Sequence, residues 1–157
     1  MSKITGLALL PALLMLTGLN LQAEEIGEVS TNIKLLGPND KVVIEAFDDP
    51  DVPGVACHLS RAKTGGFKGA VGLAEDTSDA SIACRQIGPI TANPSNLKQG
   101  VEVFGIKTSL VFKKMHVVRY YDRNRNTLIY LVYSDRLIDG SPKNAISTVP
   151  IMPWRKE

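Results

Sequence analysis

Short alternating or continuous apolar stretches, separated by clusters of turn-forming residues, run through most of the chain after residue 40. Val55, Cys57 and Leu59, for example, would share one face of an extended strand, because successive side chains alternate across a strand. Gly, Pro, Asn and Asp clusters end these stretches, as expected of turns. The strands predicted in this way are Val42–Phe47, Val55–Ser60, Ser81–Ile87, Val101–Ile106, Leu110–Phe112, Met115–Tyr121 and Thr127–Ser134.

The number and length of these stretches predict the fold class. Met115–Tyr121 and Thr127–Ser134 are apolar on both faces, and the short polar loop Asp122–Asn126 between them predicts a β-hairpin. Lys143–Ser147 is expected to form one helical turn. Short strands with little helix predict a mainly β fold, either an antiparallel β-sandwich or a partly open barrel.

The N-terminus has the pattern of a secretory signal peptide. The cation Lys3 precedes an apolar run, Ile4–Leu16, and a more polar stretch then ends at the small residue Ala23. We expect cleavage after about Ala23, with no membrane span left in the processed protein, because the run is too short for a transmembrane helix. The mature chain, Glu24–Glu157, is predicted to be one β-rich domain located in the periplasm.

Composition and charge narrow the possible partners. The chain is 44% hydrophobic and 22% charged, as in ordinary globular proteins, and its net charge of +2 gives no reason to expect a nucleic-acid partner. The charge is uneven, because residues 24–90 hold 6 Lys or Arg against 11 Asp or Glu, whereas residues 91–157 hold 11 against 5. Two interpretations of this asymmetry are possible. An acidic and a basic face could steer a partner, or the two halves could pack on each other so that their charges largely compensate, and we favour the second.

Cys57 and Cys84 are the only cysteines, and export would carry them into an oxidising compartment. We therefore predict a disulfide between two inward-facing strand positions, which stabilises the fold by about 3.6 kcal/mol in the chain-entropy model. No metal site is predicted, because the adjacent Cys57 and His58 would point to opposite faces of a strand. Another hypothesis is that the protein is a client of the thiol-oxidising machinery and that its disulfide reports redox state.

A glycine-rich loop in the segment between Cys57 and Cys84, which the disulfide would close into a ring, is the candidate binding site. Its spacing matches no phosphate-binding motif, so no cofactor is predicted, but surface loops often carry binding sites. The residues proposed to bind are Gly65, Gly66, Lys68, Gly69 and Gly72, together with the acidic Glu75, Asp76 and Asp79. The predicted partner is an unknown small molecule or an envelope protein, bound without catalysis.

The alternative function is a hydrolase of cell-wall or carbohydrate material. Two of Asp48, Asp51, Asp76 and Asp79 would then act as a paired acid and base, which requires a defined separation of their carboxyl groups. The stretch Ser60–Gly65 contains S-x-x-K and K-T-G, but the two motifs share one lysine. On a continuing strand Ser60 and Lys63 would face opposite sides, so no catalytic residue is assigned.

Several long segments closely resemble the CreA family, named catabolite regulation protein A, and together they span nearly all of the mature chain. These segments are Glu45–Val52, Ser60–Gly66, Gly72–Ala80, Thr108–Lys113, Tyr133–Asp135, Gly140–Ser147 and Met152–Arg155. The resemblance implies a small exported protein of Gram-negative bacteria, whose family name reflects a genetic neighbourhood concerned with carbon-source response. It implies no established activity, substrate or catalytic residue, and it therefore supports a periplasmic location and leaves the mechanism open.

Overall fold

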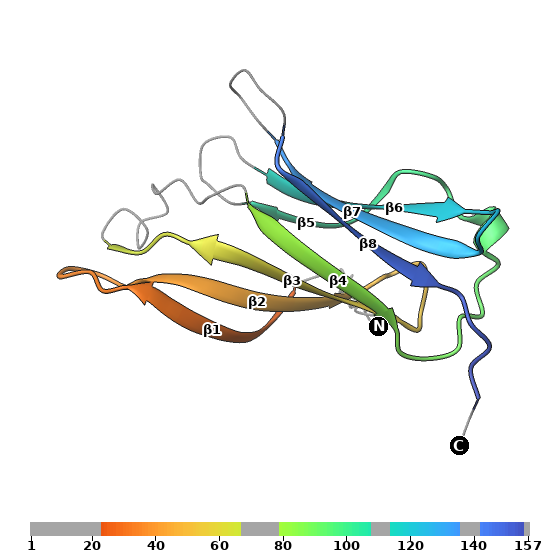
Figure 1. The fold of residues 1–157 in the computed structure, drawn as a ribbon, viewed down its shortest axis with the longest axis horizontal. Helices are drawn as coiled ribbons and strands as arrows, with labels where there is room; N and C mark the ends of the chain where they lie inside the picture. Colours follow the sequence, from red (N-terminus) through yellow and green to blue (C-terminus); the bar gives the residue numbers. More distant parts are fainter. Residues whose placement is uncertain (1–22, 67–78, 108–113, 136–141, 156–157) are drawn as a thin grey trace, which may run out of the picture.

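The computed structural model describes residues 23–66, 79–107, 114–135 and 142–155, which form two four-stranded antiparallel sheets (Figure 1). The first sheet has the order β1 (Glu24–Asn32), β2 (Asp40–Asp48), β3 (Val55–Lys63) and β4 (Ala80–Gln86). The second has the order β5 (Val101–Lys107), β6 (Lys114–Asp122), β7 (Thr127–Ser134) and β8 (Asn144–Pro150). The mainly β fold predicted from the sequence is confirmed.

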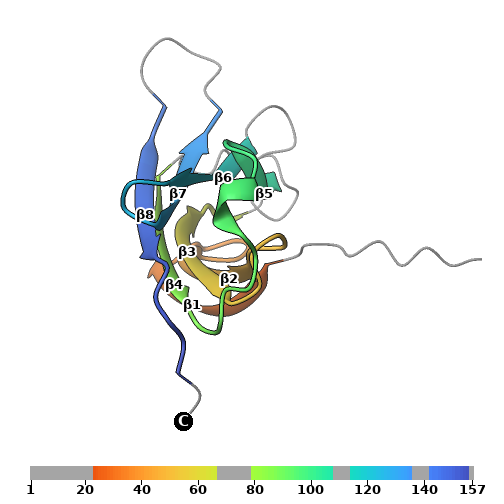
Figure 2. The same ribbon diagram turned by 90° about the vertical axis from the view of Figure 1, so that its right-hand side faces the viewer.

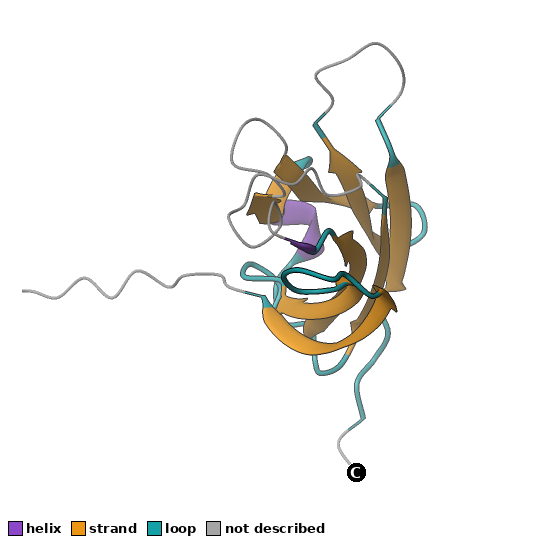
Figure 3. Cartoon of the chain, turned by 90° about the vertical axis from the view of Figure 1, so that its left-hand side faces the viewer, coloured by secondary structure: helices purple, strands orange, loops and turns teal. Residues whose placement is uncertain are grey.

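Each sheet is a meander, in which every strand pairs with the next one along the chain. A 3-10 turn, η1 (Pro94–Asn96), lies in the connection between the sheets and is drawn as a helix in Figure 3. The side chain of Asn93 begins this turn by accepting a hydrogen bond from the N–H of Ser95. Among the described residues, no helix has both the length and the apolar character needed to cross a membrane.

The sheets pack face to face, and strands β4 and β8 lie side by side (Figure 2). The N–H of Cys84 in β4 donates to the hydroxyl of Ser147 in β8 at 2.8 Å. The alternating side chains of each sheet meet between the layers, where the rings of Phe47 and Phe104 stack with centroids 4.3 Å apart. The predicted inward positions Val55, Cys57 and Leu59 are fully buried in this core.

The structure differs from the prediction in two strands. The helical turn predicted at Lys143–Ser147 is wrong, because residues 144–147 belong to β8, where Ala145, Ser147 and Val149 are the more buried alternate residues. Strand β1 was not predicted, since its side chains are almost all exposed and show no apolar alternation. Pairing with β2 makes β1 extended, which a local pattern does not reveal. The strand predicted at 110–112 lies outside the described residues.

Candidate functional site

The predicted disulfide is present. Cys57 and Cys84 are bonded, and the register of β3 and β4 places them directly opposite each other. Both side chains are buried in the core between the sheets. The bond therefore closes the base of the ring that contains the candidate glycine-rich loop.

Gly65 and Gly66, the first residues of that loop, pack against the connection between β1 and β2. The N–H of Gly65 donates to Asp40 at 2.7 Å, and the N–H of Gly66 donates to the carbonyl of Pro38. A Cβ at Gly65 would lie 2.1 Å from the Pro38 carbonyl oxygen, so only glycine fits there. These two glycines hold one backbone segment against another.

The other residues of the predicted site are not brought together by what the structure describes. Lys68, Gly69, Gly72, Glu75 and Asp76 lie outside the described residues. The carboxylate of Asp79 lies 3.2 Å from the ammonium group of Lys143, and both side chains are exposed. The binding role proposed for this loop stays a prediction.

The register of the first sheet separates Asp79 from Asp48 and Asp51, three of the carboxylates of the alternative hydrolase hypothesis. Asp79 precedes Ala80 at the start of β4, whereas Asp48 is the last residue of β2 and Asp51 lies in the turn that follows, near the end of β4. The length of β4 places them about 20 Å apart, too far for a shared acid and base. Asp51 is also bonded to Arg119, and Asp76 lies outside the described residues.

A possible serine–histidine pair is also ruled out by strand alternation. Ser134 and His116 both lie in the second sheet, and Asp135 contacts His116. The buried Ser134 pairs with Met115 and shares its inward face, whereas His116 follows Met115 and points to the outer face. The serine hydroxyl therefore cannot reach the imidazole.

His116 is held between two carboxylates on the outer face of the second sheet. Its Nδ1 lies 2.7 Å from Glu102, its Nε2 lies 3.0 Å from Asp135, and its ring stacks on Tyr133. Burial lowers the pKa of His116, but the hydrogen bonds and charges of the two carboxylates outweigh burial and raise the pKa above its ordinary value of 6.5. Because both ring nitrogens are bonded to carboxylates, which favour the charged form of the ring, His116 is poorly suited to act as a general base.

Charged residues also line the inner face of the first sheet, away from the disulfide. Six side chains from β1, β2 and β3 form this charged network: Glu25, Glu28, Lys41, Glu45, Arg61 and Lys63. Arg61 donates to both carboxylate oxygens of Glu45, at 2.8 and 3.0 Å, and both side chains are buried. Burial raises the pKa of Glu45, but Arg61 and Lys63 outweigh it and lower the pKa below 4.5.

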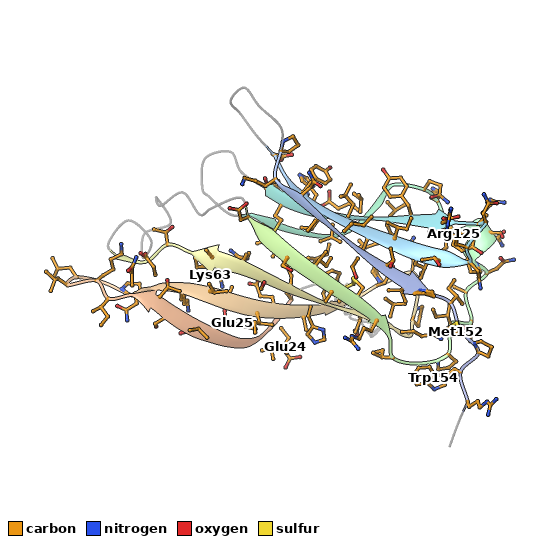
Figure 4. The ribbon with its side chains drawn as sticks, viewed as in Figure 1. Glu24, Glu25, Lys63, Arg125, Met152 and Trp154 are labelled. Atoms are coloured by element: carbon orange, nitrogen blue, oxygen red, sulfur yellow. A yellow bond between two sulfur atoms is a disulfide. The ribbon has the colours of Figure 1, made fainter. Side chains whose placement is uncertain are left out.

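Lys63 connects this buried pair to the outer strand of the sheet. Its ammonium group lies 3.0 Å from Glu25 and 3.4 Å from Glu45. Figure 4 shows Glu25 and Lys63 on this sheet in the left half of the view, whereas Arg125 and Trp154 lie toward the right. Three carboxylates and three cations thus compensate each other, which suits a structural role better than acid–base catalysis. Among the described residues, no cluster of His, Cys, Asp or Glu is suited to hold a metal ion.

The connection between β1 and β2 presents a different kind of surface. Ile33, Leu35 and Leu36 are 88%, 100% and 81% exposed, although aliphatic side chains of this size usually avoid water. We call residues 33–36 the hairpin tip. Sequence reasoning missed this surface, because an Ile-Lys-Leu-Leu run in front of Gly-Pro has no strand or helix period.

Comparisons with known proteins show the family of this chain. A family model described as CreA protein matches residues 26–154, a range that includes the hairpin tip and nearly all of both sheets. The chain belongs to the CreA family. Protein CreA of Escherichia coli K12 is 58% identical over 146 residues, which cover 91% of this chain and 93% of the relative. The CreA proteins of Escherichia coli O6:H1 and O157:H7 match to the same extent.

The resemblance to CreA proteins noted in the sequence is therefore confirmed. No solved structure matches the chain significantly. Membership in the CreA family adds no activity, ligand or catalytic residue, so the function has to be argued from the surfaces of this molecule.

Proposed function

We propose that this CreA-family protein is a non-enzymatic binding or accessory protein of the cell envelope of Gram-negative bacteria. It works in the periplasm after removal of its signal peptide, and it contacts an apolar partner through the hairpin tip. The N-terminal pattern of charge and hydrophobicity and the disulfide between Cys57 and Cys84 support this location.

The observation that carries the proposal is the exposure of three large aliphatic side chains within four consecutive residues. A single exposed leucine is ordinary on a protein surface, but a group of them at the end of a hairpin is typical of a contact surface. Two of the four candidate acids or bases are instead paired with cations, Asp51 with Arg119 and Asp79 with Lys143. Binding therefore has more support than hydrolysis.

Sedimentation with isolated cell envelopes tests the proposal. The exported protein is purified from the periplasm and mixed with envelope fragments, beside a Leu35→Ser/Leu36→Ser variant and a matched Ile146→Ser control. Ile146 is 61% exposed on β8, so its replacement removes a comparable apolar side chain from another surface.

We expect the wild type and the Ile146→Ser control to sediment with the envelopes, and the double variant to stay in the supernatant with unchanged circular dichroism. Equal sedimentation of all three proteins, or of none, would show that the hairpin tip is not a contact surface.

A further inference from the structure

The three aliphatic side chains of the hairpin tip are open to solvent on nearly all sides. Because Ile33, Leu35 and Leu36 are each at least 81% exposed, a flat protein surface laid against the hairpin would cover only one side of them. A fluid apolar medium surrounds a narrow tip completely. This favours a lipid partner over a flat protein partner.

Several polar groups at the base of the tip are bonded within the protein. The N–H of Lys34 donates to the side chain of Asn39 at 3.0 Å, and the ammonium group of Lys34 lies 2.9 Å from Asp40. Gly65 and Gly66 hold the returning strand by bonding to Asp40 and to the carbonyl of Pro38. These contacts anchor the base of the tip, and the bonded groups need not lose bonds to water when the tip is buried.

Charge near the tip also suits a phospholipid surface. Lys34 is the only charged residue between Val29 and Asn39, and it lies among the aliphatic side chains that would be inserted. The nearest carboxylates on the hairpin are both paired with lysines, Asp40 with Lys34 and Glu28 with Lys41. Because an ammonium group has three N–H donors, Lys34 can bond a lipid phosphate while it stays paired with Asp40.

The dimensions of the hairpin agree with a shallow insertion. The last strand pair before the tip is Asn32 with Asp40, a polar pair at the level where the chain would leave the apolar layer. Leu35 and Leu36 lie three and four residues beyond Asn32, which corresponds to about 10 Å of extended chain. Interfacial segments typically lie about 5–10 Å deep in the boundary between headgroups and acyl chains.

We infer that the hairpin tip inserts Ile33, Leu35 and Leu36 into the interface of a phospholipid bilayer, with Lys34 at the phosphate level. This inference rests on the proposed function and names the partner of the same surface as a membrane. The aliphatic side chains supply most of the attraction, so binding is expected to depend only weakly on lipid charge and on salt.

Tryptophan fluorescence with protein-free vesicles tests the insertion. Trp154 is the only tryptophan, so a Trp154→Phe background removes the native signal. Leu35→Trp in this background places a probe in the tip, and Ile146→Trp places a matched probe on β8. The vesicles are either pure phosphatidylcholine or phosphatidylcholine with an equal amount of phosphatidylglycerol.

We expect vesicles of both compositions to shift the emission of the Leu35→Trp variant to shorter wavelength, with quenching by brominated acyl chains. The Ile146→Trp emission is expected to stay unchanged. In vesicle sedimentation, Leu35→Ser/Leu36→Ser should lower partitioning at least about tenfold, whereas Ile146→Ser should have no effect.

An unchanged emission of the Leu35→Trp variant would overturn the lipid inference, as would equal loss of partitioning in the Ile146→Ser control. The two proposals fail separately. If envelope binding depends on Leu35 and Leu36 but protein-free vesicles do not bind, the partner is a protein and the proposed function stands. If neither envelopes nor vesicles bind, both proposals are wrong.

Discussion

Asp49 and Arg119 lie 70 residues apart in the chain and form a 2.6 Å ion pair with both side chains buried. Asp49 is in the turn between β2 and β3, and Arg119 is on the inner face of β6, so the pair connects the two sheets. Tyr130 of β7 donates its hydroxyl to the second carboxylate oxygen of Asp49 at 2.7 Å. One carboxylate thus satisfies two buried groups of the opposite sheet.

Asp49→Ala is expected to lower the free energy of unfolding by about 3–5 kcal/mol, because it leaves the guanidinium of Arg119 buried without its main partner. Urea denaturation of the purified protein measures this change. Asp51 provides a matched control, because it also bonds Arg119 but is 52% exposed. Asp51→Asn should change stability by less than about 1 kcal/mol. Similar losses for the two variants would show that burial does not control the strength of this contact.

The His116 cluster predicts a pH dependence of stability. The pKa of His116 is raised in the folded protein, so its stabilising effect is complete below 6.5 and is lost as the pH rises through the higher folded pKa. Burial raises the pKa of Glu102, but Lys114 and His116 outweigh it and lower the pKa below 4.5. The contribution of Glu102 is therefore present above 4.5 and is lost as the pH falls through the lower folded pKa.

These two groups should stabilise the fold most between about pH 4.5 and 6.5. The difference in unfolding free energy between the wild type and His116→Gln is expected to be largest in this range and to shrink in alkaline solution. Denaturation at several pH values measures it, and an NMR titration of the His116 ring gives the folded pKa directly. A His116 pKa at or below 6.5 would contradict the prediction.

Gly65 is expected to tolerate no side chain. Gly65→Ala would place a Cβ 2.1 Å from the carbonyl oxygen of Pro38, so one of the two backbone segments must move. We expect a loss of more than about 1 kcal/mol in stability and faster hydrogen exchange in residues 33–40. Gly27→Ala in β1 is the control, because nothing lies within 4 Å of a Cβ at Gly27. Equal behaviour of the two variants would show that the close contact at Gly65 is absent in solution.

Residues with a local pattern were predictable, whereas residues whose role depends on distant partners were not. The alternation of Val55, Cys57 and Leu59 identified β3 and its inward face, because burial of one face leaves a period of two in the sequence. Glu45 and Arg61 occupy inward positions of the same kind, but as charged residues they suggest a solvent-exposed face until their pairing across β2 and β3 is known.

The hairpin tip could not be predicted for the opposite reason. Leu35 and Leu36 have the chemistry of core residues, and a sequence does not show that Gly65 and Gly66 hold this segment away from the core. The pairing of Asp49 with Arg119 likewise follows from the packing of the two sheets, which no local spacing indicates. Local sequence patterns therefore predict single strands and their buried faces, but not the contacts between the sheets.

The disulfide is expected to stabilise the fold mainly by lowering the conformational entropy of the unfolded chain, and less by its contacts in the folded protein. Reduction of Cys57–Cys84, which are 27 positions apart, frees a long loop in the unfolded state, and the free energy of unfolding should fall by roughly 3–4 kcal/mol. Urea denaturation with and without dithiothreitol measures this difference. A Cys57→Ala/Cys84→Ala variant is the control, because its stability should not respond to the reductant. If the wild type is equally stable when reduced, the cross-link does not stabilise the fold. The hypothesis that the disulfide reports redox state would then gain support.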